Sequence, residues 1–253
     1  MITGASFGIG REAAKCFARA GAKVALVARS QKELEDAARQ IRDAGGRAET
    51  FPYDLSKIDG IPSLVAHVES KLGPVDVLVN NAAYAVTGLA EDCPIEQYRK
   101  NFEVNFYAPL ALIQAVIPGM KQKGNAQIIN VSSGVGRRAL PGVSPYCATK
   151  FALCGLTESL RLEVKRYGID VLVIFPGRVE SKFHERIESY GKLNRKLPPI
   201  PMKPAEEVGA FIVRASRNRK REATVFGPGM IGYHLNYWAP KLVDRLLARR
   251  FPI

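Results

Sequence analysis

The sequence predicts an α/β protein in which a doubly wound parallel sheet of about seven strands carries helices on both faces. Short apolar runs alternate with amphipathic segments along most of the chain, and this alternation favours right-handed strand–helix–strand crossovers. Hydrophobic residues make up 47% and charged residues 24% of the 253 residues, so a large core is available. We expect residues 1–253 to form a single domain, because sheet proteins of this length commonly remain undivided.

Strands are expected where apolar residues run on continuously, because the strands of a parallel sheet are covered on both faces. Four runs (KVALVA, VDVLV, QIINV, IDVLVIF) and two less apolar stretches (AETFP, ATVF) fit this pattern. They occupy residues 23–28, 75–79, 127–131, 169–175, 48–52 and 223–226. The segments between them predict helices at residues 8–20, 31–44, 58–72, 95–123, 145–167 and 205–217.

The first strand is unusually short. Only Met1, Ile2 and Thr3 precede the first glycine turn, whereas a strand usually has about 5–6 residues. Either this strand is a stub or the natural chain starts further upstream, and the second alternative is our hypothesis.

A glycine-rich turn, TGASFGIG at residues 3–10, joins this strand to the first expected helix. Glycines let backbone amides approach a pyrophosphate, and a helix N-terminus favours its negative charge. The spacing of the glycines resembles the TGxxxGIG turn of the short-chain dehydrogenase/reductase family, which has a Rossmann-type fold.

Further motifs carry this resemblance along the chain to about Phe183. They are Asp-Leu at 54–55, NNAA at 80–83 (the family has NNAG), Pro-Gly at 176–177, and Ser181 in place of a family threonine. The resemblance implies cofactor binding by Gly4, Ser6, Phe7, Gly8, Ile9, Gly10, Arg29, Asp54, Leu55, Asn81, Ala82, Tyr146, Lys150, Pro176, Gly177, Val179 and Ser181.

The choice of cofactor is argued from the end of the second strand. A carboxylate there binds the ribose 2′-hydroxyl of NAD and would repel a 2′-phosphate. The chain has Ala28, Arg29 and Ser30 at this place, and the planar guanidinium of Arg29 suits a phosphate. Arg11 adds a second candidate cation. NADP(H) is therefore expected in preference to NAD(H).

Tyr146 and Lys150 form a YxxxK pair on one face of an expected helix. A lysine ammonium beside the phenol is expected to lower the tyrosine pKa from its ordinary value of about 10, which would make Tyr146 a general acid in reduction and a base in oxidation. Lys150 is also expected to hold the nicotinamide ribose.

Two upstream polar residues complete the catalytic set by resemblance. Ser133, thirteen positions before the tyrosine, is expected to bind the substrate oxygen with Tyr146, and Ser132 would point the other way on an extended strand. Asn105 matches the family asparagine that supports a water-linked proton relay, whereas Asn101 matches less well. The expected catalytic residues are Asn105, Ser133, Tyr146 and Lys150.

Cys147 and Cys154 are interpreted as core residues, because no histidine is placed to activate them. The four cysteines and three histidines show no metal-ligand spacing, so no metal site is expected. Reduced thiols and the lack of a visible signal peptide predict a cytoplasmic protein.

The net charge is +13, and residues 178–253 hold 16 Lys/Arg against 7 Asp/Glu. The basic run at 217–221 lies at a helix end without interleaved aromatic residues, so nucleic-acid binding is not expected. Residues 178–203 have the place of the family's substrate lid. Residues 235–251 predict a basic amphipathic helix, which either lies on a membrane surface or packs on this domain or a second subunit.

The leading interpretation is an NADP(H)-dependent oxidoreductase that interconverts a ketone or aldehyde and an alcohol. Mostly apolar loops around the expected site favour a hydrophobic carbonyl substrate. The alternatives are a non-catalytic NADP(H)-binding regulatory protein and a membrane-surface reductase of lipid-like carbonyls. The resemblance also implies a homodimer or homotetramer built through the long helices.

Overall fold

The computed structural model describes residues 1–191, 202–225 and 235–251. A seven-stranded, wholly parallel sheet runs through its centre in the order β3-β2-β1-β4-β6-β7-β9. This confirms the predicted doubly wound α/β fold. The strands are β1 (Ile2–Thr3), β2 (Lys23–Ala28), β3 (Arg47–Pro52), β4 (Val77–Asn80), β6 (Ala126–Val131), β7 (Ile169–Phe175) and β9 (Glu222–Thr224).

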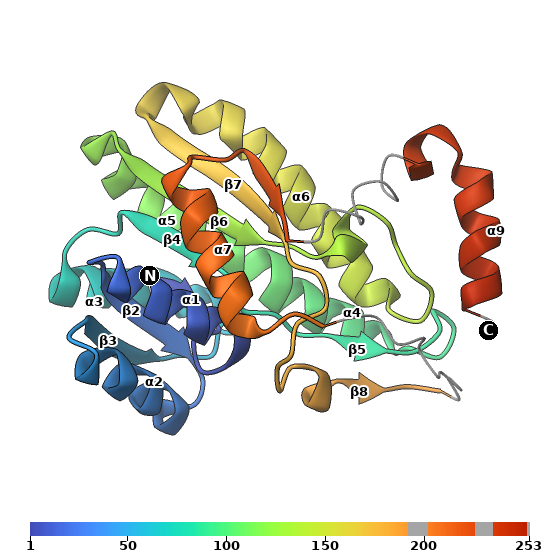
Figure 1. Ribbon diagram of the computed structural model, residues 1–253, viewed down its shortest axis with the longest axis horizontal. Helices are drawn as coiled ribbons and strands as arrows, with labels where there is room; N and C mark the ends of the chain where they lie inside the picture. The colour runs from blue at the N-terminus through green and yellow to red at the C-terminus, as the bar shows by residue number, and fades with distance from the viewer. Residues whose placement is uncertain (192–201, 226–234, 252–253) are drawn as a thin grey trace.

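Helices cover both faces of the sheet (Figure 1). One face carries α1 (Gly8–Arg19), α2 (Gln31–Asp43) and α7 (Ala205–Arg217), and the other carries α3 (Ile61–Leu72), α5 (Ala108–Lys123) and α6 (Ser144–Val164). Short segments complete the described elements: η1 (Ile58–Gly60), α4 (Ile95–Phe102), η2 (Glu103–Tyr107), η3 (Gly134–Gly136), η4 (Lys165–Tyr167), η5 (His184–Arg186) and α9 (Pro240–Arg250).

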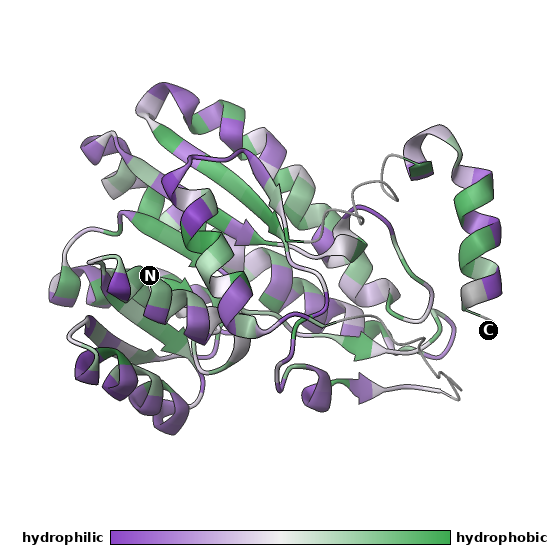
Figure 2. Ribbon diagram, in the orientation of Figure 1, coloured by the Kyte–Doolittle hydropathy of each residue, from purple (hydrophilic) through white to green (hydrophobic). Residues whose placement is uncertain are grey.

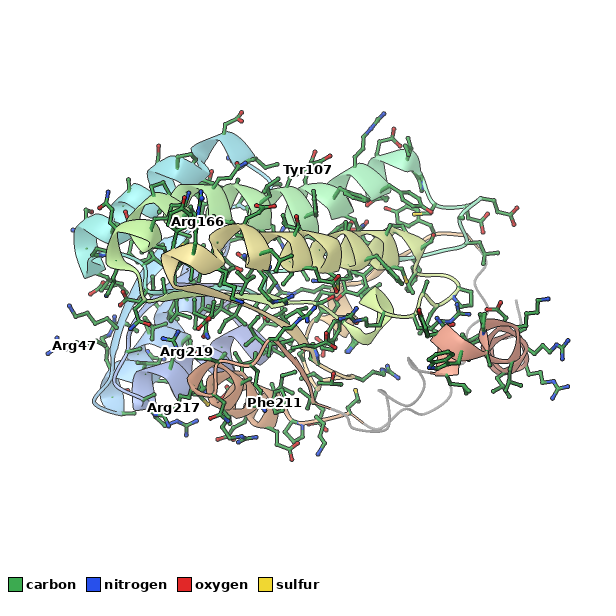
Figure 3. The ribbon with its side chains drawn as sticks, turned by 90° about the horizontal axis from the view of Figure 1, so that it is seen from above. Arg47, Tyr107, Arg166, Phe211, Arg217 and Arg219 are labelled. Carbon is green, nitrogen blue, oxygen red and sulfur yellow. The ribbon has the colours of Figure 1, made fainter. Side chains whose placement is uncertain are left out.

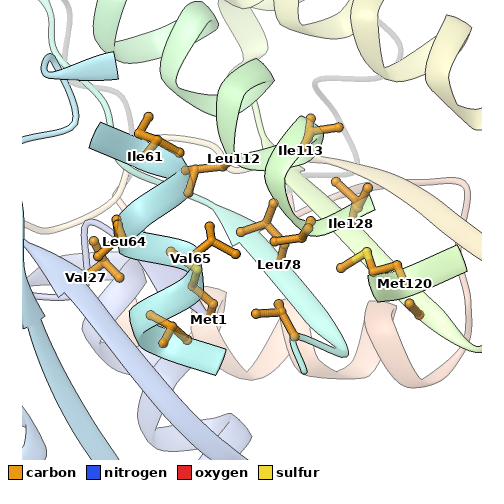
Figure 4. Close-up of a cluster of buried hydrophobic side chains, with 14 of the residues drawn as sticks. Met1, Val27, Ile61, Leu64, Val65, Leu78, Leu112, Ile113, Met120 and Ile128 are labelled. Carbon is orange, nitrogen blue, oxygen red and sulfur yellow. The ribbon is translucent and has the colours of Figure 1, made fainter. Parts of the chain in front are cut away.

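The core forms two layers, one on each side of the sheet, because neighbouring strand residues point to opposite faces. Along β2, Val27 packs toward α3 and α5, whereas Leu26 packs toward α1, α2 and α7. Figure 4 shows part of the first layer, in which Leu78 and Ile128 of the sheet belong to the same buried cluster as Leu112 of α5. Figure 2 shows the same arrangement as hydrophobic strands inside helices with polar outer faces.

The structure differs from the sequence-based expectations in its short elements. The expected helix at residues 95–123 is divided by a π-helical segment, η2, between α4 and α5. A separate parallel pair, β5 (Val86–Thr87) with β8 (Glu188–Ser189), was not expected. Phe226 of the expected last strand and residues 192–201 of the expected lid lie outside the described residues.

The two-residue strand β1 lies in the middle of the sheet, between β2 and β4. Met1 extends its pairing, because its carbonyl accepts from the Val79 amide at 2.9 Å and its amino group donates to the Val77 carbonyl at 2.9 Å. From β1 the chain adds β2 and β3 on one side of the sheet, and then continues with β4 on the other side. Ligands of doubly wound sheets bind outside the carboxyl ends of the strands at the point where the strand order reverses in this way.

Candidate active site

The glycine turn after β1 brings backbone close to the neighbouring strand. Gly4 has φ +66°, and a Cβ there would lie 2.9 Å from the Cα of Ala82. A Cβ on Gly10 would lie 2.3 Å from the Gly4 carbonyl oxygen, so a side chain does not fit beneath the turn. Phe7 is the N-cap residue of α1, and its side chain makes no hydrogen bond to the first amides of the helix. These amides can therefore donate to a ligand.

Thr3 and Asn81 fasten this turn to the end of β4. The Thr3 hydroxyl accepts from the amides of Asn81 and Ala82 at 3.0 Å each, and the Asn81 amide group donates to the Thr3 carbonyl at 2.9 Å. Thr3 was not among the residues expected at the site. The sequence feature that could have indicated Thr3 is its position directly before Gly4, at the end of the central strand.

A cavity of about 1070 Å³ opens at this edge of the sheet. Its walls include every expected cofactor-binding residue except Gly10, which lies below the turn, and also Ser133. The structure therefore brings together motifs that are up to 177 residues apart in the chain, from Gly4 to Ser181.

Arg29 and Asp54 line the end of the cavity beside β2 and β3. Partial burial works against ionisation of Asp54, but hydrogen bonds from the Ser56 amide and hydroxyl, together with Arg29, hold its pKa below the usual range. Arg29 is exposed and makes no ion pair within the described residues. Arg11 instead pairs with Asp36 of α2 and does not line the cavity, contrary to the expectation that it adds charge there.

Ser133 and Tyr146 meet at the opposite end of the cavity. Ser133 follows β6, and its hydroxyl forms a hydrogen bond with the phenol of Tyr146 on α6. Burial of the phenol raises the pKa of Tyr146 above its ordinary value, and the Ser133 bond only partly opposes this effect. The expected lowering of this pKa by Lys150 is thus not found, because desolvation outweighs the other influences. The Ser132 hydroxyl lies against the Lys150 carbonyl and the Cys154 sulfur instead.

Lys150 is 2% exposed, and its Nζ lies 5.4 Å from the centre of the Tyr146 ring. Nζ donates to the carbonyl of Val131 at 2.9 Å. Burial lowers the pKa of Lys150 to about 8. The amine is therefore held beside the phenol by the end of β6.

Asn105 lies in the π-helical segment η2 and is completely buried. Its Oδ1 accepts from the Tyr84 amide at 2.7 Å, and its Nδ2 donates to the Tyr84 carbonyl at 2.7 Å and to Thr149 Oγ1 at 3.1 Å. π-helical turns inside α-helices are frequent at functional sites. Asn105 does not line the cavity, whereas Tyr84 does, so this asparagine fixes part of the cavity wall. Asn101, also buried, bonds to the Gln97 carbonyl at 2.8 Å.

The segment after β7 closes the remaining side of the cavity. The Phe183 ring centre lies 6.3 Å from that of Tyr146. Arg186 stacks over the Phe7 ring at 4.4 Å and pairs with Glu33 of α2 at 3.1 Å, so it bridges the glycine turn and the second helix. This segment belongs to the expected lid at residues 178–203, but sequence reasoning named none of the following cavity-lining residues in it individually: Arg178, Phe183, His184, Arg186, Ile187 and Glu188. The family resemblance fades at this point, and no local motif marked them.

Comparisons with known proteins agree with this geometry. A family model described as short chain dehydrogenase matches residues 1–190. Dehydrogenase/reductase SDR family member 7B of Rattus norvegicus is 32% identical over 263 residues, covering 99% of this chain and 80% of that protein.

Two solved structures share the fold. A metagenomic short-chain oxidoreductase in complex with NADP has a TM-score of 0.74 and 30% identity, covering 88% of this chain and 94% of that one. A short-chain dehydrogenase/reductase from Burkholderia phymatum in complex with NAD has a TM-score of 0.85 at 22% identity, with 95% and 93% covered. The second likeness concerns the fold alone.

Proposed function

The chain belongs to the short-chain dehydrogenase/reductase family of oxidoreductases, and we propose that it interconverts a ketone or aldehyde and an alcohol with NADP(H). The observation that carries this proposal is the meeting of Ser133, Tyr146 and Lys150 in the cavity that the glycine turn lines. A binding protein without chemistry would not need a hydroxyl pair backed by a buried amine.

The residues fit a dinucleotide. The crowded glycines of the turn and the uncapped start of α1 suit a pyrophosphate. Asp54 and Leu55, which line the cavity, would contact the adenine. The bound nicotinamide would supply or accept the hydride. Arg29 supports NADP(H) over NAD(H), because its cation is exposed at the ribose end and makes no ion pair within the described residues. The similar metagenomic oxidoreductase was solved with NADP.

Ser133 and Tyr146 would hold the substrate oxygen between their hydroxyls. Because burial raises the pKa of Tyr146, the phenol keeps its proton at neutral pH. A protonated phenol suits reduction, in which Tyr146 gives its proton to the oxygen as the carbonyl carbon receives the hydride. In the oxidation direction Tyr146 must first lose this proton, so we expect oxidation to need a more alkaline solution.

Lys150 and Asn105 act behind the tyrosine. The Lys150 ammonium, close to the ring and tied to Val131, would stabilise the phenolate that remains after proton transfer and bind ribose hydroxyls. Both amide hydrogens of Asn105 are engaged by Tyr84 and Thr149. Its support of a proton relay is therefore positional: it fixes Tyr84 on the wall and Thr149 next to Lys150.

The substrate end of the cavity favours an apolar carbonyl compound. Its lining there includes Val104, Val135, Leu140 and Ile187. Lys100 also lines the cavity, but its ammonium is occupied over the Tyr84 ring at 4.4 Å. An apolar surface of this kind gains more from a hydrophobic substrate than from a polar one.

The test is the substitution Tyr146→Phe. Removing the phenol hydroxyl should lower kcat for NADPH-dependent reduction of apolar ketones and aldehydes by about 10²–10⁴-fold, the usual contribution of a general acid. NADPH binding, followed by nicotinamide fluorescence, should persist, because the ring remains in place.

A wild-type protein that binds NADPH but reduces no member of a broad carbonyl panel would favour the regulatory alternative. Turnover that survives Tyr146→Phe would reject the assigned acid. Ser159→Ala is a suitable control, since this exposed hydroxyl on the same helix bonds to Glu163 and does not line the cavity, so its removal should leave both readouts unchanged.

A further inference from the structure

The C-terminal part of the described chain stands apart from the helices that flank the sheet (Figure 1). Residues 235–238 form a short helical turn, and after a break at Ala239 the chain continues as α9. Val243 and Phe251 are buried at 8% and 5% exposure, so one side of this helix packs on the protein.

An ion pair fixes the orientation of α9. Asp244 pairs with Arg138, which belongs to the loop after η3 and also lines the cavity. Asp244 lies next to Val243, so the helix presents its acid to the body of the protein. Its opposite side faces away from the contact that holds it.

Several large apolar side chains of this segment are uncovered. Trp238 and Tyr237 are 80% and 78% exposed, and their rings meet edge to face at 5.3 Å. Leu242 and Leu246, one helical turn apart, are 47% and 49% exposed. Large apolar side chains gathered in this way mark an interaction surface more often than scattered ones do.

Cations run beside the leucines. Lys241, Arg245 and Arg249 follow one another at intervals of four residues and are exposed. None of them makes an ion pair within residues 1–191, 202–225 and 235–251. Asp244 is the single acid between residues 235 and 251, and Arg138 neutralises it on the inner side.

We propose that this outer face, formed by Tyr237, Trp238, Lys241, Leu242, Arg245, Leu246 and Arg249, binds the surface of an anionic lipid bilayer. The leucines would enter the boundary between headgroups and acyl chains, the aromatic rings would lie at headgroup level, and the cations would meet lipid phosphates. No helix in the described part of the chain is long and apolar enough to cross a membrane.

A second copy of the chain is a poorer occupant. A two-fold contact brings the same surface of both copies together. Lys241, Arg245 and Arg249 would then face their own counterparts with no described acid on the outer face to compensate, and like charges in contact oppose association.

The Arg138–Asp244 pair places this face beside the cavity, because Arg138 takes part in both. Bound to a bilayer, the protein would meet hydrophobic carbonyl compounds where they are dissolved. This last step rests on the proposed function, whereas lipid binding itself does not.

The chain contains one tryptophan, Trp238, so its fluorescence reports on the outer face alone. We would add vesicles of phosphatidylcholine, with and without phosphatidylserine, to the purified full chain at low salt. The expected result is a blue shift of the emission and co-sedimentation with the anionic vesicles only, both weakened by salt. No shift and no sedimentation would overturn the proposal. So would a lipid-independent blue shift that grows with protein concentration, because it would show a second copy covering Trp238.

A pair of triple variants separates the face from the overall charge. Lys241→Glu, Arg245→Glu and Arg249→Glu together should lower partitioning onto anionic vesicles by about 100-fold or more. The control reverses three exposed cations far from this face, Lys71, Arg217 and Lys220, with the same change of net charge. Equal loss in both variants would overturn the proposal. NADPH fluorescence should be unchanged in both, which shows that they are folded and separates this outcome from a failure of the proposed reaction.

Discussion

At the scale of single residues, the proposed preference for NADP(H) depends on one side chain. Arg29 directly follows β2 without an acidic neighbour in the sequence, and its side chain is exposed and lines the cavity. Arg11, the other candidate, is engaged by Asp36. Any recognition of a 2′-phosphate on this side therefore falls to Arg29.

We predict that Arg29→Ala weakens NADPH binding by about 10–100-fold, the effect of losing a charge-assisted hydrogen bond worth roughly 1.5–3 kcal/mol. NADH binding should hardly change, because that cofactor lacks the phosphate. Titrations followed by nicotinamide fluorescence would measure both constants. Arg47→Ala is the matched control, since Arg47 is exposed at the end of the molecule away from α9 (Figure 3). Equal weakening of NADPH and NADH in Arg29→Ala would contradict a role in phosphate recognition.

Sequence reasoning worked at this scale wherever a motif fixed the backbone. The alternation of side chains in an extended chain predicted that Ser133 and not Ser132, both just after β6, faces the tyrosine. In the structure the Ser133 hydroxyl bonds to Tyr146, and the Ser132 hydroxyl lies against the Lys150 carbonyl. It failed for properties that depend on packing. The pKa of Tyr146 follows from how deeply its hydroxyl is enclosed, and the partner of Arg11 follows from where α2 lies.

At the scale of elements, the turn between β1 and α1 depends on Gly10 for space and not for backbone freedom. A side chain on Gly10 would collide with the Gly4 carbonyl and the Asn81 amide, and both belong to the frame of the cofactor cavity. Gly155, in the middle of α6, meets nothing within 4 Å.

Replacing Gly10 and Gly155 by alanine should change the free energy of unfolding in opposite directions. Gly10→Ala should cost about 1–3 kcal/mol of the free energy of unfolding through overpacking, with loss of NADPH binding. Gly155→Ala should gain roughly 0.5–1 kcal/mol, because alanine is the better helix former, and leave binding intact. Chemical unfolding and nicotinamide fluorescence would measure the two effects. A Gly10→Ala variant that binds NADPH normally would show that the turn can rearrange.

Elements with a strong periodic pattern could be predicted, and β2 and β7 match their expected bounds residue for residue. The π-helical segment could not, because it differs from an α-helix only in how its carbonyls are bonded, with no change in the apolar pattern. The pair β5 and β8 has two residues in each strand, too few for any alternation to show.

At the scale of the whole molecule, the C-terminal third was least predictable. One helix was expected over residues 235–251, but the structure has a helical turn at 235–238, a break at Ala239 and then α9. The way α9 attaches, through Asp244 and Arg138 across 106 positions of sequence, is a contact that no local pattern encodes. The side of α9 that stays exposed follows from that attachment.

The exposed surface also bears on how copies of the chain would associate. On α6, Phe151 and Leu162 are 44% and 76% exposed, and their spacing of eleven residues puts them on one side of the helix. Tyr107, 48% exposed, lies on the same helical layer of the molecule (Figure 3). The long helices are where the family resemblance implies that subunits meet, and a two-fold contact there would bury these side chains.

We predict that the wild-type chain is a homodimer or homotetramer and that Phe151→Glu with Leu162→Glu releases smaller species, because two carboxylates would be buried in a contact with no cation to pair them. Light scattering after size-exclusion chromatography would give the masses. Leu246→Glu, on α9, is the matched control and should leave the mass unchanged. If it were Leu246→Glu that dissociated the assembly, the subunits would meet through α9, and the outer face would be occupied by protein instead of lipid.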